Sequence, residues 1–183
     1  MVPVEIDTLK LFDEIHERDS RQKYFAVINR ETGEHRPITL YDRYHAVEQI
    51  TLSKHVPDRI REHFDTARNL LVYSWFVYRF IPVAELHAYA SLEYALKERN
   101  STSEKGLKRL LELAVERGWI KDSGFKHFQP DVVDAEERIV SENLDSSDVQ
   151  DYCKILVDTL PYLRNEIAHG SSFLHPSGLT TLA

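Results

Sequence analysis

Apolar residues recur at steps of three and four along much of the chain, which is the spacing of one face of an α-helix. The clearest stretch begins at Asp58, where the pattern runs through Ile60, Phe64, Ala67, Leu71, Ser74, Tyr78 and Ile81. Pro82 then breaks or kinks the chain and opens a second helix to about Arg99. The centre of the sequence therefore predicts two consecutive helices.

Two further helices are expected towards the C-terminus. Residues 103–118 carry an apolar stripe and end at Gly118, a residue typical of the position after a helix. A last pattern begins near Ser146 and meets Pro161, where the helix must kink or end and restart. Residues 162–169 continue as helix up to Gly170. Between these helices, residues 129–148 form an acidic insertion, with a short helix expected over 131–138.

The N-terminal third is less regular. Residues 5–18 have the spacing of a short amphipathic helix, and residues 23–38 have the β-prone and turn residues of a hairpin. Thr39 is a candidate N-cap for a helix that runs to about residue 54. We therefore expect a mainly all-α protein, with an N-terminal extension over 1–55 and a helical bundle over 56–183.

Composition changes this picture mainly through charge. The formal net charge of −7 argues against a broad basic face, so a nucleic-acid contact requires a local basic patch. The single cysteine, Cys153, excludes an intrachain disulfide and a cysteine-based zinc site, and its helical context predicts a small buried side chain. The N-terminus shows no signal-peptide pattern, and the apolar run over 70–84 is too short to span a membrane. We expect a cytoplasmic protein with no membrane contact.

Residues 164–169, Arg-Asn-Glu-Ile-Ala-His, carry the strongest candidate chemistry. Asn165 and His169 are four residues apart and share a helix face, so the amide can orient the imidazole. Arg164 and His169 are separated by roughly 140° and flank a cleft more naturally than they pair. From the residues alone, a helix-capping or salt-bridge cluster is the favoured interpretation.

Other polar groups are weaker candidates. Asp13 with His16, and His45 with Glu48, have the spacing of two metal ligands on a helix, but no third ligand is predicted beside either pair. We interpret both as surface pairs and expect no metal and no cofactor. The arginines at 59, 61 and 68 alternate with acidic residues, which indicates a solvent-exposed face. Ser171, Ser172 and His175 lack the nucleophile elbow of a hydrolase.

The string over residues 163–170, Leu-Arg-Asn-Glu-Ile-Ala-His-Gly, resembles the Arg-x(4–6)-His motif of HEPN domains, in which a polar residue often follows the arginine. The helical segments 88–99 and 110–118 also look like helices of such proteins, so the resemblance covers about residues 56–175. It implies an antiparallel helical bundle that forms a homodimer. Residues 178–183 read like the start of a helix that is cut off, so the chain is a candidate fragment.

The resemblance also implies a function. Catalytic HEPN proteins are metal-independent endoribonucleases, often of toxin or defence type, in which two motifs share one cleft. Arg164 would then bind the scissile phosphate, His169 would act as general acid or base, and Asn165 would orient one of them. RNA and an antitoxin or other partner protein are the implied partners. The alternatives are a catalytically silent HEPN-like module for dimerisation, sensing or scaffolding, and an unrelated bundle with a coincidental motif.

Overall fold

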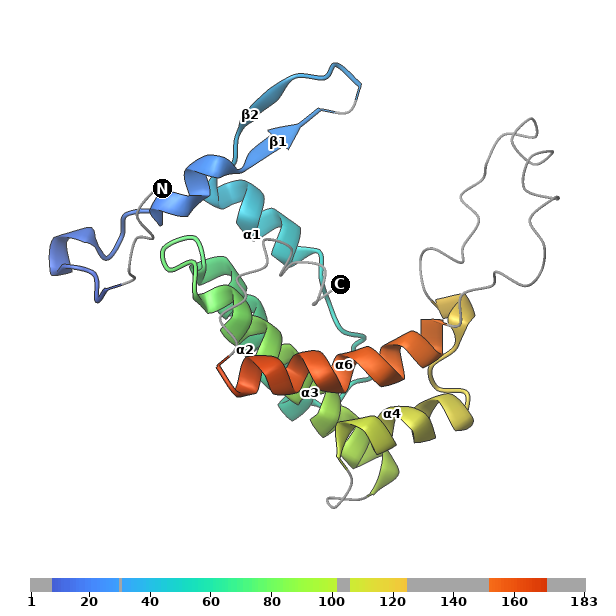
Figure 1. Cartoon of the computed structure of the whole chain (residues 1–183). Helices are drawn as coiled ribbons and strands as arrows, with labels where there is room; N and C mark the ends of the chain where they lie inside the picture. The colour runs from blue at the N-terminus through green and yellow to red at the C-terminus, as the bar shows by residue number, and fades with distance from the viewer. Residues whose placement is uncertain (1–7, 30, 102–105, 125–151, 171–183) are drawn as a thin grey trace. The chain divides into compact units, whose positions relative to one another are not determined.

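Helices make up most of the described chain. The computed structural model describes residues 8–29, 31–101, 106–124 and 152–170. Within these ranges the α-helices are α1 (Leu40–Glu48), α2 (Asp58–Tyr73), α3 (Phe80–Asn100), α4 (Leu107–Glu116) and α6 (Tyr152–Ala168) (Figure 1). The expectation of a mainly helical protein is confirmed.

The chain divides into two compact units, and the division falls within α3 between Ser91 and Leu92. The described residues of the first unit are 8–29 and 31–91, and those of the second are 92–101, 106–124 and 152–170. The acidic segment 129–148, the short helix expected over 131–138 and the C-terminal stretch 178–183 lie outside the described residues. No helix within the described ranges is both long and apolar enough to cross a membrane.

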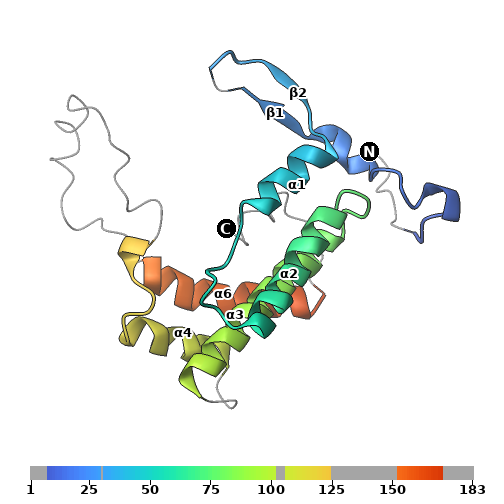
Figure 2. The same cartoon turned by 180° about the vertical axis from the view of Figure 1, so that it is seen from behind.

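The hairpin expected over residues 23–38 is present in the first unit. Strands β1 (Ala26–Ile28) and β2 (His35–Pro37) pair antiparallel with Ala26 opposite Pro37. Figures 1 and 2 show the strands as one two-stranded ribbon ahead of α1. In the connecting turn, the Asn29 side chain accepts a hydrogen bond from the Glu31 amide at 2.9 Å, and Gly33 has a φ of +73°. Glycine suits this position because it has no Cβ to oppose positive φ.

Thr39 caps α1, as the sequence predicts. Its side chain accepts a hydrogen bond from the Asp42 amide, and the Asp42 carboxylate accepts one from the Thr39 amide, which completes a capping box. Arg36 binds the same carboxylate, and its hydrogen bonds lower the pKa of Asp42. The expected end near residue 54 is wrong, because α1 ends at Glu48.

The amphipathic helix expected over residues 5–18 is also wrong over its described part. Only a 3-10 turn, η1 (Phe12–Glu14), forms there, and Phe12 is 86% exposed. A helix this short needs an apolar surface to pack against, because its first turn costs more free energy than it returns. A second 3-10 helix, η2 (Ser20–Tyr24), follows it.

The sequence places the break between the two central helices at Pro82, and the structure corrects this. α2 ends at Tyr73, and Pro82 lies in the first turn of α3. Residues 74–79 form a turn whose backbone groups bind η2 and its N-cap. The Asp19 carboxylate accepts a hydrogen bond from the Tyr78 amide at 2.9 Å, and the Gln22 amide donates to the Ser74 carbonyl at 2.9 Å. These distant partners make an early helix end favourable despite a continuing apolar pattern.

The core of the first unit lies between α1, α2 and α3. Its buried side chains are Val47, Ala67, Leu71, Tyr78, Ile81, Ala84 and Ala88. The line of small residues on α3 contributes Ala84, Ala88 and Ser91 to the interior of this unit.

The second unit has its own core, built from the end of α3, α4 and α6. Its buried side chains are Leu96, Leu107, Leu110, Leu111 and Ala114, with Leu156, Val157 and Leu160 of α6 packed against them. Cys153 is buried, as expected. Gly118 has a φ of +65° and follows α4 in the predicted way. α6 continues through Pro161, so the alternative in which the helix ends there is excluded.

Candidate functional site

The predicted motif lies at the C-terminal end of α6. Arg164 and Asn165 are in its last two turns, and His169 follows its last residue. The His169 amide donates to the Asn165 carbonyl at 2.9 Å, which extends the helical hydrogen bonding by one residue. Gly170 then takes a φ of +84°, the left-handed conformation expected after a helix end.

Arg164 is fixed by two side chains. Its Nη2 lies 3.3 Å from Oε2 of Glu93 on α3, and its Nη1 donates to Oδ1 of Asn165 at 3.0 Å. The Glu93 side chain is only 13% exposed, whereas that of Arg164 is 37% exposed. Glu93 is itself held by Lys97 one turn later, at 2.6 Å. The guanidinium is therefore anchored on one side and open to solvent on the other.

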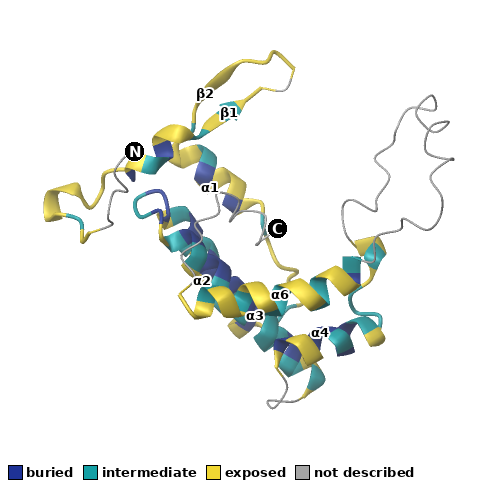
Figure 3. Cartoon of the chain, in the orientation of Figure 1, coloured by how far each residue is buried: buried dark blue, intermediate teal, exposed yellow. Residues whose placement is uncertain are grey.

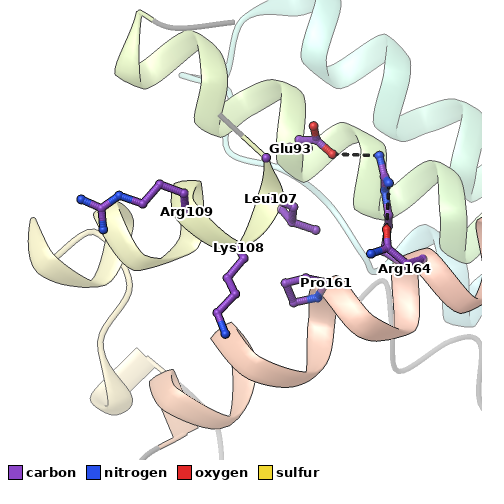
Figure 4. A pocket seen from close by; sticks show the side chains of 8 residues that line it. Glu93, Leu107, Lys108, Arg109, Pro161 and Arg164 are labelled. Atoms are coloured by element: carbon purple, nitrogen blue, oxygen red, sulfur yellow. Dashed lines mark hydrogen bonds and ion pairs between the residues drawn. The ribbon is translucent and has the colours of Figure 1, made fainter. Parts of the chain in front are cut away.

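Arg164 and Asn165 line an open cleft between α4 and α6 with a volume of about 400 Å³. The remaining lining comes from Glu93 on α3, Pro161 on α6 and the start of α4, namely Gly106, Leu107, Lys108 and Arg109. Figure 4 shows Leu107 and Pro161 between Lys108 on one side and the joined Arg164 and Glu93 on the other. The Arg109 side chain points away from Arg164 in the same view.

The cations of the cleft are each paired with a carboxylate. Lys108 lies 3.1 Å from Asp158, and Arg164 is paired with Glu93. Arg109 contacts both Glu112 and Glu116 at 3.0 Å, and these hydrogen bonds raise its pKa. The Lys108 and Arg109 pairs are solvent-exposed, so each holds its partner only weakly. An incoming anion can compete for these cations without breaking a buried contact.

The start of α4 adds a second positive element to the cleft. Gly106 is the N-cap and supplies no side-chain hydrogen bond, so the first backbone amides of α4 have no side-chain cap. Unpaired amides at a helix N-terminus carry partial positive charge and favour an anion. Together with Arg164 and Lys108, this end of α4 makes the cleft suited to a phosphate-sized anion.

The three predicted site residues are only partly brought together. Arg164 and Asn165 share the cleft, but His169 does not line it. The expected pairing of the Asn165 amide with the His169 ring stays a prediction, because the hydrogen bond that the structure gives this amide comes from Arg164. His169 is exposed, as Figure 3 shows for much of α6.

The sequence does not identify Glu93 and Lys108 as residues of the site. Glu93 and Lys97 are four apart in a predicted helix, which is a recognisable ion-pair spacing, but nothing local indicates that Glu93 meets Arg164. Lys108 is one of two lysines near a predicted helix start, the other being Lys105. Its place in the cleft depends on how α4 crosses α6, which only packing decides.

Among the weaker candidates, His45 and Glu48 form a surface pair. His45 Nδ1 lies 3.3 Å from Glu48, and both side chains are about half exposed. Among the described residues, no three His, Cys, Asp or Glu side chains gather in a way that suits a metal ion. On α2, Arg61 pairs with Asp58, and Arg68 pairs with Asp65. The expectation of a solvent-exposed face is wrong for Arg68, because its side chain is only 23% exposed and also donates to the carbonyls of Val47 and Glu48 on α1. Ser171, Ser172 and His175 lie outside the described residues.

One histidine pair in the first unit was not anticipated. The rings of His63 on α2 and His87 on α3 stack with centroids 4.3 Å apart. The buried Ser91 hydroxyl donates to the His87 carbonyl at 2.8 Å and lies 2.7 Å from His63 Nδ1. Burial and the nearby His63 lower the pKa of His87. Because parallel stacked rings direct their nitrogens into separate planes, this pair is not arranged to share a metal.

Comparisons with protein-family models, with curated proteins and with solved structures give no match for this chain, so its assignment depends on the residues of the cleft themselves.

Proposed function

We propose that the chain is a HEPN-like endoribonuclease that cleaves RNA without a metal ion, with the Arg164 cleft as its phosphate site. The observation that carries the proposal is the placement of Arg164 in an open cleft beside the start of α4 and Lys108. A guanidinium offers bidentate hydrogen bonds to a phosphate, and the α4 amides favour the same charge. The motif resemblance supplies the reaction type.

In this mechanism the RNA 2′-oxygen attacks the adjacent phosphorus. The 2′-O–P bond forms, the bond from phosphorus to the 5′-oxygen of the next nucleotide breaks, and a 2′,3′-cyclic phosphate remains. The proton of the 2′-hydroxyl goes to a general base, and a general acid protonates the departing 5′-oxygen. His169 serves as acid or base, and Arg164 stabilises the charge that develops on the phosphoryl oxygens.

Asn165 has a more specific role than the sequence indicates. Because its Oδ1 accepts from Arg164 Nη1, it limits the orientations open to the guanidinium. Glu93 does the same from α3. A guanidinium held by two acceptors loses less side-chain entropy when a phosphate binds.

His169 lies outside the lining of the cleft, so we infer that a second copy of the chain completes the site. One copy would supply Arg164 and the other His169 to each phosphate. This arrangement predicts complementation. A mixture of Arg164→Ala and His169→Ala chains should regain cleavage, although each variant alone is inactive.

The test is cleavage of a labelled single-stranded RNA in EDTA by the wild type, Arg164→Ala, His169→Ala and their mixture. We expect each substitution to lower the rate by about a hundredfold or more. Arg61→Ala and His55→Ala are matched controls, since both residues belong to the first unit and neither lines the cleft, so both should leave the rate unchanged. Absent wild-type cleavage, or cleavage that survives both motif substitutions, would contradict the proposal.

The alternative is a catalytically silent HEPN-like module for dimerisation, sensing or scaffolding. The specific observation in its favour is that Arg164 and Lys108 already have carboxylate partners in the cleft. Under this alternative the Arg164–Glu93 pair is structural. Arg164→Ala would then lower the free energy of unfolding or weaken self-association, and RNA would remain intact.

A further inference from the structure

A second positive surface lies at the opposite end of α4 from the cleft. Arg99, Arg117, Trp119 and Lys121 form it, and we refer to them as the Trp119 patch. The Arg99 guanidinium lies 4.2 Å from the centroid of the Trp119 ring, and the Arg117 guanidinium lies 5.1 Å from it. Arg117 also donates to Oδ1 of Asn100 at 2.8 Å. All of these residues belong to the second unit.

The local sequence explains why these groups gather. Gly118 turns the chain with a φ of +65°, and the Trp119 and Ile120 amides both donate to the Ala114 carbonyl, at 2.8 and 3.3 Å. This turn brings Trp119 back onto the core of the unit. It also brings Lys121 over Gly118, where a Cβ would lie 3.3 Å from the Lys121 side chain. The turn therefore collects cations from α3 and from the end of α4.

The charge of the Trp119 patch is not compensated within the described residues. Four other cations of the second unit, Lys97, Lys108, Arg109 and Arg164, each contact a carboxylate at 2.6 to 3.3 Å. Arg99, Arg117 and Lys121 have no ion pair with any described residue. The nearest following acid, Asp122, instead accepts a hydrogen bond from the Cys153 amide at 2.9 Å. In a chain with a net charge of −7, this is a local exception.

We propose that the Trp119 patch binds the phosphate backbone of single-stranded RNA at a second point outside the cleft. The choice of RNA rests on the proposed function. Two guanidinium groups held against one indole keep their outer hydrogen-bond donors free while losing part of their rotational freedom before binding. Guanidinium groups also match phosphate oxygens in geometry, so two fixed arginines suit successive phosphates.

The distance along α4 supports a single strand that reaches both points. The start of α4 lines the cleft, and its end carries Arg117. A helix of this length spans about 15 Å. At roughly 3.4 Å per nucleotide of a stacked strand, the span corresponds to about four nucleotides. An RNA of a few nucleotides should therefore occupy only the cleft, whereas a longer strand should also contact the Trp119 patch.

The test compares binding of two fluorescein-labelled oligouridylates, one of about three and one of about twelve nucleotides. Binding is measured by fluorescence anisotropy in EDTA, with His169→Ala in every protein so that cleavage does not interfere. The test variant is Arg99→Gln with Arg117→Gln. The matched control is Arg36→Gln with Arg61→Gln. It also removes two positive charges, but from arginines that already have carboxylate partners.

We expect the test variant to bind the longer RNA about tenfold more weakly at low salt and the shorter RNA equally well. Its plot of log affinity against log salt should become shallower by about 1.4, or about 0.7 for each lost phosphate contact. The control should change neither RNA by more than about twofold. If the double variant does not fold, as judged by circular dichroism, Lys121→Gln replaces it. That variant should lower the salt slope by about 0.7 without disturbing the Trp119 contacts.

Several outcomes would overturn the inference. One is unchanged affinity of the test variant for the longer RNA, and another is an equal loss of affinity for both RNA lengths. An equal loss of affinity in the control variant would also overturn it. So would an Arg117-dependent affinity for phosphatidylserine vesicles that exceeds the affinity for RNA. The result is separable from the proposed function. Length-dependent binding through the Trp119 patch supports this inference even if the wild type cleaves no RNA, in which case only the nuclease proposal fails.

Discussion

The Arg164 guanidinium lies 3.3 Å from the Glu93 carboxylate, which joins the last turns of α6 to α3 across 71 residues of sequence. Glu93 therefore has two opposing effects on the cleft. It holds Arg164 in place, and it adds a negative charge beside the site proposed for phosphate. Which effect dominates can be measured, because glutamine keeps the hydrogen-bond acceptor and removes the charge.

Glu93→Gln should strengthen binding of single-stranded RNA by about threefold to tenfold, since a partly screened charge at this distance is worth about 1 kcal/mol. Arg164 should stay in the cleft because the amide oxygen still accepts its hydrogen bond. Anisotropy titration in EDTA measures the change. Glu112→Gln, which removes a carboxylate paired with Arg109, serves as the control. Weaker binding by Glu93→Gln would mean that the charge is needed to position Arg164.

Asp19 should be important for the stability of the first unit. Its carboxylate accepts from the Tyr78 amide at 2.9 Å and pairs with Arg21 at 2.7 Å, and Asp19 is 8% exposed. Asp19→Ala leaves the Tyr78 amide without this acceptor, so the free energy of unfolding should fall by about 2 kcal/mol. Asp19→Asn keeps one acceptor oxygen and should lose less. Urea denaturation measures both, with exposed Asp13→Ala as the control. Equal stability of Asp19→Ala and Asp13→Ala would contradict this role.

The Asp19 carboxylate should also make the free energy of unfolding depend on pH in the acidic range. Burial alone would raise the pKa of Asp19, but the hydrogen bonds from Arg21 and Tyr78 lower it overall. A carboxyl group whose pKa is lower in the folded state stabilises the protein at pH values above the pKa of the unfolded chain, which is about 4 for aspartate. That contribution disappears as pH falls through the folded pKa. Asp19→Asn should therefore reduce the steepness of acid unfolding, followed by circular dichroism, and an unchanged acid transition would count against it.

His87 should give a second pH dependence, at a higher pH. Burial and the neighbouring His63 lower its pKa, so the unfolded chain takes up the proton first as pH falls. The free energy of unfolding should therefore decline as pH falls below about 6.5, until the folded pKa is reached. His87→Phe keeps an aromatic ring against His63 but cannot be protonated, and it should reduce this decline. Urea midpoints at several pH values measure it. Exposed His55→Phe should behave as the wild type, and a decline that survives in His87→Phe would refute the assignment.

Pro161 should destabilise α6. It lies inside the helix, has no amide hydrogen to donate, and its ring clashes with the carbonyl four residues earlier, that of Val157. Pro161→Ala should raise the free energy of unfolding by about 1 to 3 kcal/mol, because alanine restores the hydrogen bond and the better helix propensity. Thermal and urea unfolding measure the gain. Thr159→Ala is the control on the same helix. A destabilised Pro161→Ala would mean that the ring packs in the cleft more favourably than its helical position costs.

Much of the local structure was predictable from the sequence because its causes lie within a few residues. Thr39 and Asp42 form their capping box three residues apart, and Gly118 takes positive φ directly after α4. The hairpin over residues 23–38 follows from β-prone residues on both sides of a turn. Cys153 is buried because it lies on the apolar face of α6. In each case, hydrogen bonding and side-chain volume within one or two turns are enough to decide the outcome.

The candidate site was only partly predictable. The motif places Arg164, Asn165 and His169 at one helix end, and α6 confirms that location. The sequence does not reveal that Glu93 and Lys108 join Arg164, because ion pairs between helices depend on how those helices cross. The same limitation applies to the Trp119 patch, where Arg99 reaches a ring twenty positions later along the chain.

The sequence by itself determined that helices form and roughly where, since helix periodicity and capping are local and their energies add along the chain. Tertiary structure decided where α2 ends, because Asp19 and Gln22 reach the 74–78 turn from more than fifty residues away. It also decided which cations are neutralised and which remain open. Arg164 and Arg117 look alike in sequence, yet within the described part of the chain one meets the Glu93 carboxylate and the other meets Asn100 and an indole. Charge pairing depends on distances of a few ångströms, which the packing of the helices fixes.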